Sequence, residues 1–105
     1  MSDQENMLNA IKEYDYYSEG QKKILSTLYQ ISIDNIAIIK VTNLASMTGY
    51  SRYMIYKTLE QFKKDGLLKL LEGGQKSFNT FKISETKLQD ILEVYNKRNS
   101  VINNK

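Results

Sequence analysis

The stretch that decides the fold is residues 42–59, which read Thr42-Asn43-Leu44-Ala45-Ser46-Met47-Thr48-Gly49-Tyr50-Ser51-Arg52-Tyr53-Met54-Ile55-Tyr56-Lys57-Thr58-Leu59. This pattern predicts two helices joined by a tight turn. Thr42 can cap the first helix, and Gly49 can adopt the positive φ that ends it. Ser51 can cap the second helix, and Ala45 is small enough for that helix to cross close over the first. We therefore predict a helix-turn-helix over residues 42–65.

The second helix of this pair has an apolar side and a polar side. Ile55, Leu59 and Phe62 recur at helical spacing, so we expect them to point into the core. The side chains left pointing outward are Arg52, Tyr53, Tyr56, Lys57 and Glu60. The two tyrosines also fit core positions, because the face of a helix and its edge are hard to separate from sequence. We interpret Met47 and Met54 as packing residues.

A hairpin follows the second helix, which Asp65-Gly66 ends. The sequence favours a strand, a glycine-rich tip and a second strand, over residues 67–71, 72–77 and 78–83. The apolar residues of the second strand do not alternate perfectly, so a bulge or a strand start near Asn79 is required. The hairpin as a whole, residues 67–83, is predicted to form a wing beside the helix pair.

This order of elements resembles the helix-turn-helix of bacterial winged-helix proteins. The matching residues are Ala45, Gly49, Tyr50 at the apolar turn position, and Ile55. The similarity covers about residues 18–95 and is specific at the level of the superfamily, so it singles out no one family. It implies a mainly α fold with a small β-hairpin: a winged helix-turn-helix with flanking N- and C-terminal helices, in one domain over residues 1–105.

The remaining elements surround this motif. Helical spacing predicts a first helix over residues 3–16, and Ser18 and Ser84 can cap two further helices. A β-branched apolar run predicts a strand over residues 36–41. The last helix is followed by a polar stretch from Asn99 to Lys105.

The terminal helices carry apolar faces larger than so small a core requires. These faces consist of Met7, Leu8, Ile11 and Tyr14 near the start and Leu88, Ile91, Leu92 and Tyr95 near the end. They could cover their own chain or join two copies. We favour a homodimer, because a lone domain that reads a few base pairs gains little specificity and two-fold dimers on inverted half-sites are the usual remedy.

Charge is unevenly distributed along the chain. Residues 1–20 contain one basic and five acidic residues, a net charge of −4, so that end is expected to avoid phosphate. Residues 51–83 contain seven basic and three acidic residues, a net charge of +4. The seven are Arg52, Lys57, Lys63, Lys64, Lys69, Lys76 and Lys82. Any one of them could simply solvate the surface, but their shared location points to a phosphate-facing surface.

The resemblance implies that the second motif helix enters the major groove of DNA. The candidate DNA-binding residues are Thr42, Asn43, Ser51, Arg52, Tyr53, Tyr56, Lys57, Lys63, Lys64, Gln75, Lys76 and Ser77. Arg52 is the predicted base reader, because a guanidinium can hold guanine O6 and N7 with two hydrogen bonds. The lysines of the second helix are expected to hold phosphates. The wing-tip residues are expected to reach the minor groove or the backbone, and Thr42 and Asn43 a phosphate at a helix N-terminus.

The chain contains no cysteine and no histidine, which removes disulfides, thiolate sites, the commonest general base and the commonest metal ligand. Nothing in the sequence supports an enzyme, a cofactor or a metal. No stretch is apolar enough to span a membrane and the N-terminus lacks a basic start, so we expect a cytoplasmic protein.

The sequence thus predicts a sequence-specific double-stranded DNA-binding protein, a small transcriptional regulator that acts as a dimer. Two alternatives stay open: a centromere-binding or replication protein of a plasmid or phage, and a winged-helix module that binds proteins. The target DNA sequence and any effector ligand are not indicated.

Overall fold

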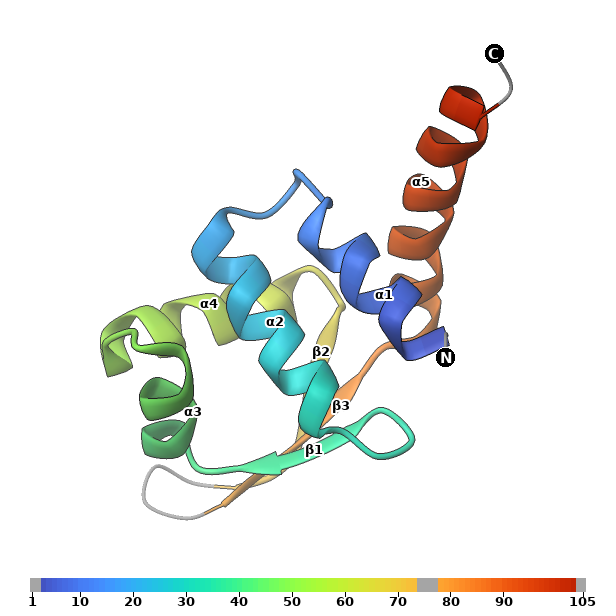
Figure 1. The fold of residues 1–105 in the computed structure, drawn as a ribbon. Helices are drawn as coiled ribbons and strands as arrows, with labels where there is room; N and C mark the ends of the chain where they lie inside the picture. The colour runs from blue at the N-terminus through green and yellow to red at the C-terminus, as the bar shows by residue number, and fades with distance from the viewer. Residues whose placement is uncertain (1–2, 74–77, 104–105) are drawn as a thin grey trace.

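The computed structural model describes residues 3–73 and 78–103. Along the described chain the elements are α1 (Asp3–Lys12), α2 (Glu19–Ile31), β1 (Ile36–Ile39), α3 (Val41–Thr48), α4 (Arg52–Lys64), β2 (Leu68–Glu72), β3 (Asn79–Ile83) and α5 (Glu85–Asn103). The fold is mainly helical with a small antiparallel sheet, and the helices α1 and α2 lie over one face of that sheet (Figure 1). The predicted winged-helix architecture, with flanking N- and C-terminal helices, is confirmed.

Helix α2 forms the centre of the core. It begins with a capping box, in which the Ser18 hydroxyl accepts the Gln21 N–H and the Gln21 side chain accepts the Ser18 N–H. Its Ile24, Leu25 and Leu28 side chains are completely buried. Helix α2 contacts α1, α3, α4 and β1, so it fixes where the helix-turn-helix lies relative to the rest of the chain.

The wing strands belong to a sheet of three strands, in the order β1-β3-β2, with both pairs antiparallel. The sequence predicted a hairpin and a separate strand, and the structure joins them. Strand β3 begins at Asn79, and the pairing with β2 shifts register between Leu70 and Glu72. The predicted strand start at Asn79 is therefore present, whereas the irregularity lies in β2 and not in the second wing strand, for which the bulge was predicted.

Four predicted boundaries are corrected. The first helix ends at Lys12 rather than at residue 16, and the strand ends at Ile39 rather than at residue 41. Thr42 is not the cap of α3: Lys40 occupies that position without a side-chain hydrogen bond, and Val41 is the first helical residue. The physical reason is that the Val41 side chain is buried in the core, which draws it into the helix and leaves Thr42 on the exposed side of the first turn. Helix α5 continues to Asn103, beyond the predicted start of a polar tail.

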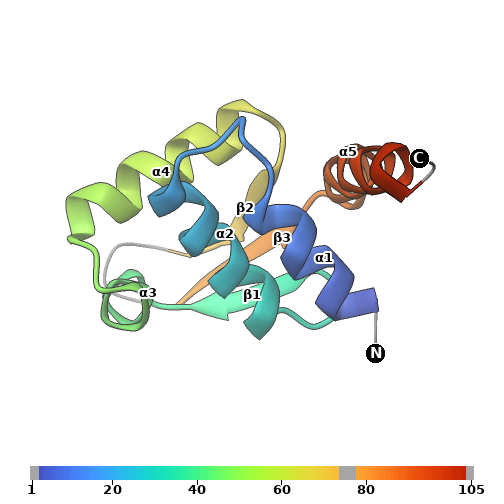
Figure 2. The ribbon, with the colours of Figure 1, turned by 45° about the horizontal axis from the view of Figure 1, so that its top comes forward.

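The terminal helices α1 and α5 pack against each other, at the end of the molecule away from α3 (Figure 2). Met7, Ile11, Leu88 and Ile91 are all buried within their own chain. Of the two uses predicted for these apolar faces, covering their own chain is the one that the structure supports. A homodimer stays a prediction.

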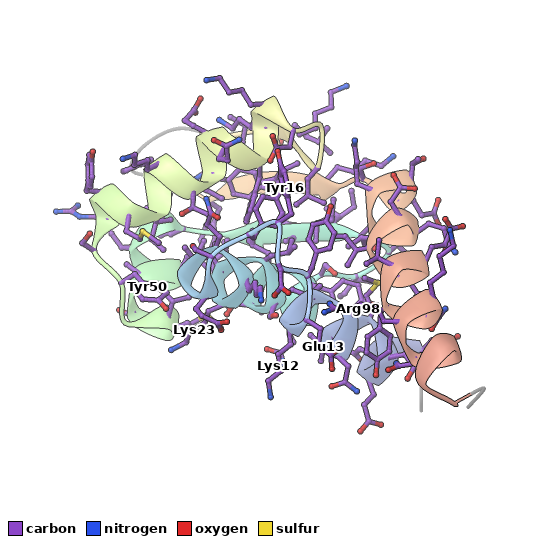
Figure 3. The ribbon with its side chains drawn as sticks, turned by 90° about the horizontal axis from the view of Figure 1, so that it is seen from above. Lys12, Glu13, Tyr16, Lys23, Tyr50 and Arg98 are labelled. Carbon is purple, nitrogen blue, oxygen red and sulfur yellow. The ribbon has the colours of Figure 1, made fainter. Side chains whose placement is uncertain are left out.

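The loop between α1 and α2 is held from three directions. The buried Lys22 ammonium donates to the Lys12 carbonyl oxygen at 3.0 Å and to Asp15 at 3.2 Å. From α5, the Arg98 guanidinium donates to the Glu13 carbonyl oxygen at 2.9 Å, and these two residues face each other in Figure 3. The Tyr17 hydroxyl donates to Asp65 at 2.7 Å, at the end of α4. The loop is thereby fixed to α2, α4 and α5 at once.

The turn between α3 and α4 predicts the response to one substitution. Gly49 has φ +80° and its absent Cβ would meet nothing within 4 Å, so the cost of Gly49→Ala is backbone strain alone. We expect Gly49→Ala to lower the free energy of unfolding by about 1 kcal/mol. Gly49→Asn should cost less, because asparagine tolerates the left-handed region. Urea denaturation of both variants measures this, and equal losses for the two would contradict the strain argument.

Candidate nucleic-acid interface

The start of α4 is built from local hydrogen bonds that the sequence predicts. The Gly49 N–H donates to the Ala45 carbonyl oxygen at 2.8 Å and closes α3. The Ser51 hydroxyl accepts the Met54 N–H at 3.1 Å and caps α4. Between them, the buried Thr48 hydroxyl donates to the Leu44 carbonyl oxygen at 2.9 Å, so the polar turn is satisfied although α3 is packed against the core. The first residue of α4, Arg52, consequently emerges at a fixed, exposed position.

The outward side of α4 carries the five residues that the sequence placed there. Ile55, Leu59 and Phe62 are buried, whereas Arg52, Tyr53, Tyr56, Lys57 and Glu60 are exposed. Tyr53 and Tyr56 do not occupy core positions, because Tyr53 is 72% exposed and Tyr56 is 40% exposed.

Two side chains on this face of α4 form a cation–π pair. The Lys57 ammonium lies 5.6 Å from the centre of the Tyr53 ring, one helical turn away. A cation over a ring face at this distance is attracted by the ring quadrupole. The pair therefore presents a positive charge and a flat aromatic surface side by side on the middle of the exposed face.

A groove of about 280 Å³ separates α4 from the wing. Its α4 side is formed by Tyr56, Glu60 and Lys63, and its wing side includes Leu70 and Phe81. Within it the Lys63 ammonium lies 3.1 Å from the Glu60 carboxylate. Part of the charge of Lys63 is thus balanced inside the protein, and Lys57 and Lys64, exposed on the same helix, are better placed for an external anion.

The first turn of α3 supplies a second group of exposed polar atoms. Thr42 and Asn43 are both exposed, and among residues 3–73 and 78–103 no side chain caps the amide groups of this turn. The position agrees with the predicted phosphate contact, although Thr42 reaches it as a helical residue and not as the cap. Beside it, the Lys40 ammonium lies 5.1 Å from the centre of the exposed Phe78 ring, at the start of β3.

Two lysines that lie beside the helix-turn-helix, Lys40 and Lys23, were not among the candidate residues predicted from the sequence. Met47 was predicted to be a packing residue, and this prediction is wrong. Lys40 directly precedes the first motif helix, which is a signal that the sequence offered. Lys23 lies in α2 with its ammonium 5.6 Å from the centre of the Tyr50 ring, and Figure 3 shows the two side chains together. No local sequence pattern indicates that α2 lies beside the turn between α3 and α4. Met47, interpreted as a packing residue, is 54% exposed on α3, because its position faces away from α2; Met54 does pack partly against the core.

The predicted basic surface is divided in two. Lys69 and Lys82 are register partners on β2 and β3, and Lys82 is exposed between the buried Phe81 and Ile83. Because successive strand residues point to opposite faces, both lysines lie on the face of the sheet that turns away from the helices. The prediction that all seven basic residues share one surface is wrong for these two. Gln75, Lys76 and Ser77, predicted for the wing tip, lie outside the described residues.

Two further observations concern only residues 3–73 and 78–103. None of the helices there is long and apolar enough to cross a membrane. No cluster of three carboxylate, cysteine or histidine side chains with the spacing of a metal site occurs in that part of the chain.

The exposed and buried sides of α4 predict different consequences for stability. We expect Arg52→Ala and Tyr53→Ala to change the free energy of unfolding by no more than about 0.5 kcal/mol, because both side chains face solvent. Ile55→Ala, from the buried side of the same helix, should cost about 2–5 kcal/mol. Thermal and urea denaturation of the three variants measure this. A large loss for Tyr53→Ala would mean that α4 is rotated from the orientation described.

Comparisons with known proteins place the fold. No protein-family model and no curated protein matches the sequence. Among solved structures, a possible transcriptional regulator from Methanosarcina mazei Go1 is similar over 91% of this chain and 82% of its own, with a TM-score of 0.59 and 10% identity. The AntR antimony-specific transcriptional repressor is similar over 93% of this chain and 78% of its own, with a TM-score of 0.48 and 15% identity. At 10% identity, the likeness to the Methanosarcina mazei protein shows a shared fold.

Proposed function

We propose that this chain is a single winged-helix domain of the helix-turn-helix DNA-binding superfamily, and that it acts as a sequence-specific transcriptional regulator on double-stranded DNA. The observation that carries the proposal is the free face of α4. That face holds a guanidinium, two tyrosines and two unpaired lysines among the described residues, and none of them is needed for the core. The fold shared with a possible transcriptional regulator agrees with this function.

The dimensions suit the major groove. An α-helix with its side chains is about 10–12 Å across and the groove is about 12 Å wide, so α4 fits with its exposed face toward the base edges. Arg52, at the first turn, is the proposed base reader. Tyr53 and Tyr56 supply hydroxyls and ring surface, and Ser51 lies at the same end of the helix.

Backbone contacts surround this central group. Lys57 and Lys64 on α4 are proposed to hold phosphates, as are Thr42 and Asn43 at the uncapped start of α3. Lys63 contributes less because Glu60 already pairs with it. From the sequence, we propose that Gln75, Lys76 and Ser77 contact the adjacent minor groove or the DNA backbone. The ends of the wing strands and the α3–α4 turn lie at the same end of the molecule in Figures 1 and 2, so one duplex could reach all of these groups.

The proposal includes a homodimer. Helix α5 is 19 residues long, and its C-terminal half extends beyond the body of the protein (Figure 1). Val94 is exposed on this helix and Tyr95 is only partly buried. We propose that this half of α5, at the end of the molecule opposite to the α3–α4 turn, joins two copies and leaves both α4 helices free for two half-sites.

Three alanine substitutions, one of an arginine and two of lysines, distinguish contacts to the bases from contacts to the DNA backbone. Arg52→Ala should weaken binding to the cognate duplex by about 1–3 kcal/mol and have much less effect on random DNA. Lys57→Ala should weaken both duplexes alike and reduce the slope of log affinity against log salt by about one. Lys82→Ala, on the far face of the sheet, is the matched control and should change neither. Fluorescence anisotropy over a range of salt concentrations measures all three.

The cognate duplex is obtained by footprinting on the native locus. One protected promoter site supports a regulator, whereas an array of tandem repeats supports a partition protein. If no genomic fragment is bound, or if affinity is insensitive to salt, a module that binds proteins replaces the proposal. Equal losses for Arg52→Ala on cognate and random DNA would remove the assignment of α4 to the major groove.

A further inference from the structure

A pocket of about 180 Å³ lies away from the proposed DNA-binding face, between the α1–α2 loop, the C-terminal end of α4 and the first turns of α5. Three tyrosines, two aspartates and one lysine form most of its wall: Tyr14, Tyr16, Tyr17, Asp65, Asp90 and Lys87. The buried Leu67 and Ile91 complete the lining. An engineered cavity of about 150 Å³ holds one benzene molecule, so this pocket is large enough for a ligand of that size.

The three tyrosine rings form a connected aromatic surface. The centre of the Tyr16 ring lies 5.1 Å from that of Tyr17 and 6.0 Å from that of Tyr14, and the ring planes are tilted or edge-on. The Tyr14 and Tyr17 centres are 5.7 Å apart. Tyr16 is 68% exposed, and Figure 3 shows it on the near side of the loop, over the space between α4 and α5. Because Lys22, Arg98 and Asp65 hold the loop, this surface is preformed.

The charge around the pocket is negative. Asp65 and Asp90 contribute two carboxylates and Lys87 one ammonium, and within the described chain Lys87 makes no ion pair with either. Burial raises the pKa of Tyr14 above its ordinary value, and Tyr16 and the two aspartates raise it further. The pKa of Tyr17 is raised by burial and by its hydrogen bond to Asp65. The site therefore disfavours additional negative charge and favours positive charge.

We propose that this pocket binds a small organic cation of the quaternary ammonium class. Ring faces attract such cations through their quadrupole, and groups of aromatic side chains are the usual means of recognising them. The two carboxylates add attraction without the ligand number that a metal ion requires. The volume limits the bound part to a head group about the size of choline.

The pocket adjoins the end of the proposed recognition helix. Asp65 is the C-cap of α4, and its carboxylate accepts hydrogen bonds from Tyr17 at 2.7 Å and from Gln61 at 3.0 Å. A quaternary ammonium beside Asp65 has no N–H to replace either donor, but its charge attracts the same carboxylate. A bound ligand is thereby coupled to the position of α4, and its effect on DNA affinity is the part of the inference that rests on the proposed function.

The direct test needs no DNA. The chain contains no tryptophan, and three of its eight tyrosines line the pocket, so a ligand there changes part of the tyrosine emission. Calorimetry gives an independent measurement. Choline should bind saturably, whereas 3,3-dimethylbutan-1-ol, which has the same shape without the charge, should not saturate over the same range. Sodium chloride at matched ionic strength corrects for salt. Equal binding of choline and the neutral alcohol, or no saturation by choline, would overturn the proposal.

Variants locate the site. Tyr16→Ala should weaken choline binding about 2- to 30-fold, and Tyr16→Phe should retain it, because the ring face and not the hydroxyl makes the contact. Asp90→Asn should weaken binding, whereas Asp34→Asn, at an exposed carboxylate outside the pocket, should not. Tyr16, Asp90 and Asp34 are all exposed, so the fold should survive each change. Unchanged affinity in both Tyr16→Ala and Asp90→Asn would place the cation elsewhere and defeat the inference.

The coupling between cation binding and DNA binding is measured separately. Saturating choline should change the affinity for the cognate duplex by several-fold relative to sodium chloride at the same ionic strength, and Asp90→Asn should abolish that change. If choline binds and the duplex binds but neither affects the other, the coupling is wrong and the cation site stands. If choline binds and no duplex does, the proposed function fails while the pocket is unaffected.

Discussion

The arrangement of this protein depends on the packing of α4 against a core that α2, α3 and β2 build together. Ile55, Leu59 and Phe62 on α4 and Ile24, Leu25 and Leu28 on α2 are almost fully buried, and burying each such side chain contributes about 1.5–3 kcal/mol. This packing fixes the rotation of α4 about its own axis. Arg52, Tyr53, Tyr56 and Lys57, on the opposite face of α4, are left exposed to solvent as a consequence.

Helix α4 also connects the two ends of the molecule. Its N-terminal end emerges from the turn at Gly49 and Ser51, beside α3 and the wing. Its C-terminal end is capped by Asp65, where the tyrosine pocket begins, next to α5. A ligand at one end and DNA at the other would therefore act on the same rigid element. A shared element with two-state behaviour is the physical requirement for coupling between separate sites.

Local signals made the helix-turn-helix predictable from sequence. The caps at Ser18, Ser51 and Ser84, the positive φ of Gly49 and the apolar stripe of α4 each involve residues within one or two turns of one another. The start of α3 was misplaced because burial of Val41 overrides the capping preference of Thr42. Lys82 lies on the face of the sheet that turns away from α4, because successive strand residues point to opposite faces. The same alternation, applied to the sequence between Phe81 and Ile83, predicts this position.

Contacts between distant parts of the chain could not be predicted in this way. The pocket brings residues 14–17 beside Asp65 and Asp90, and Lys23 meets Tyr50 only because α2 crosses the turn. No periodicity in the sequence encodes either contact. The buried Lys22 is similar: its ammonium donates to the Lys12 carbonyl oxygen and to the Asp15 carboxylate, and its place on a helical pattern does not indicate either contact.

The central claim is that the exposed face of α4 enters the DNA, and amide chemical-shift mapping of the labelled protein during titration with its cognate duplex tests it most directly. The account predicts that the largest shifts fall on residues 51–57 and on the first turn of α3. It also predicts that Lys69 and Lys82, on the outer face of the sheet, stay unchanged. Shifts centred on those two lysines, with α4 unaffected, would contradict it.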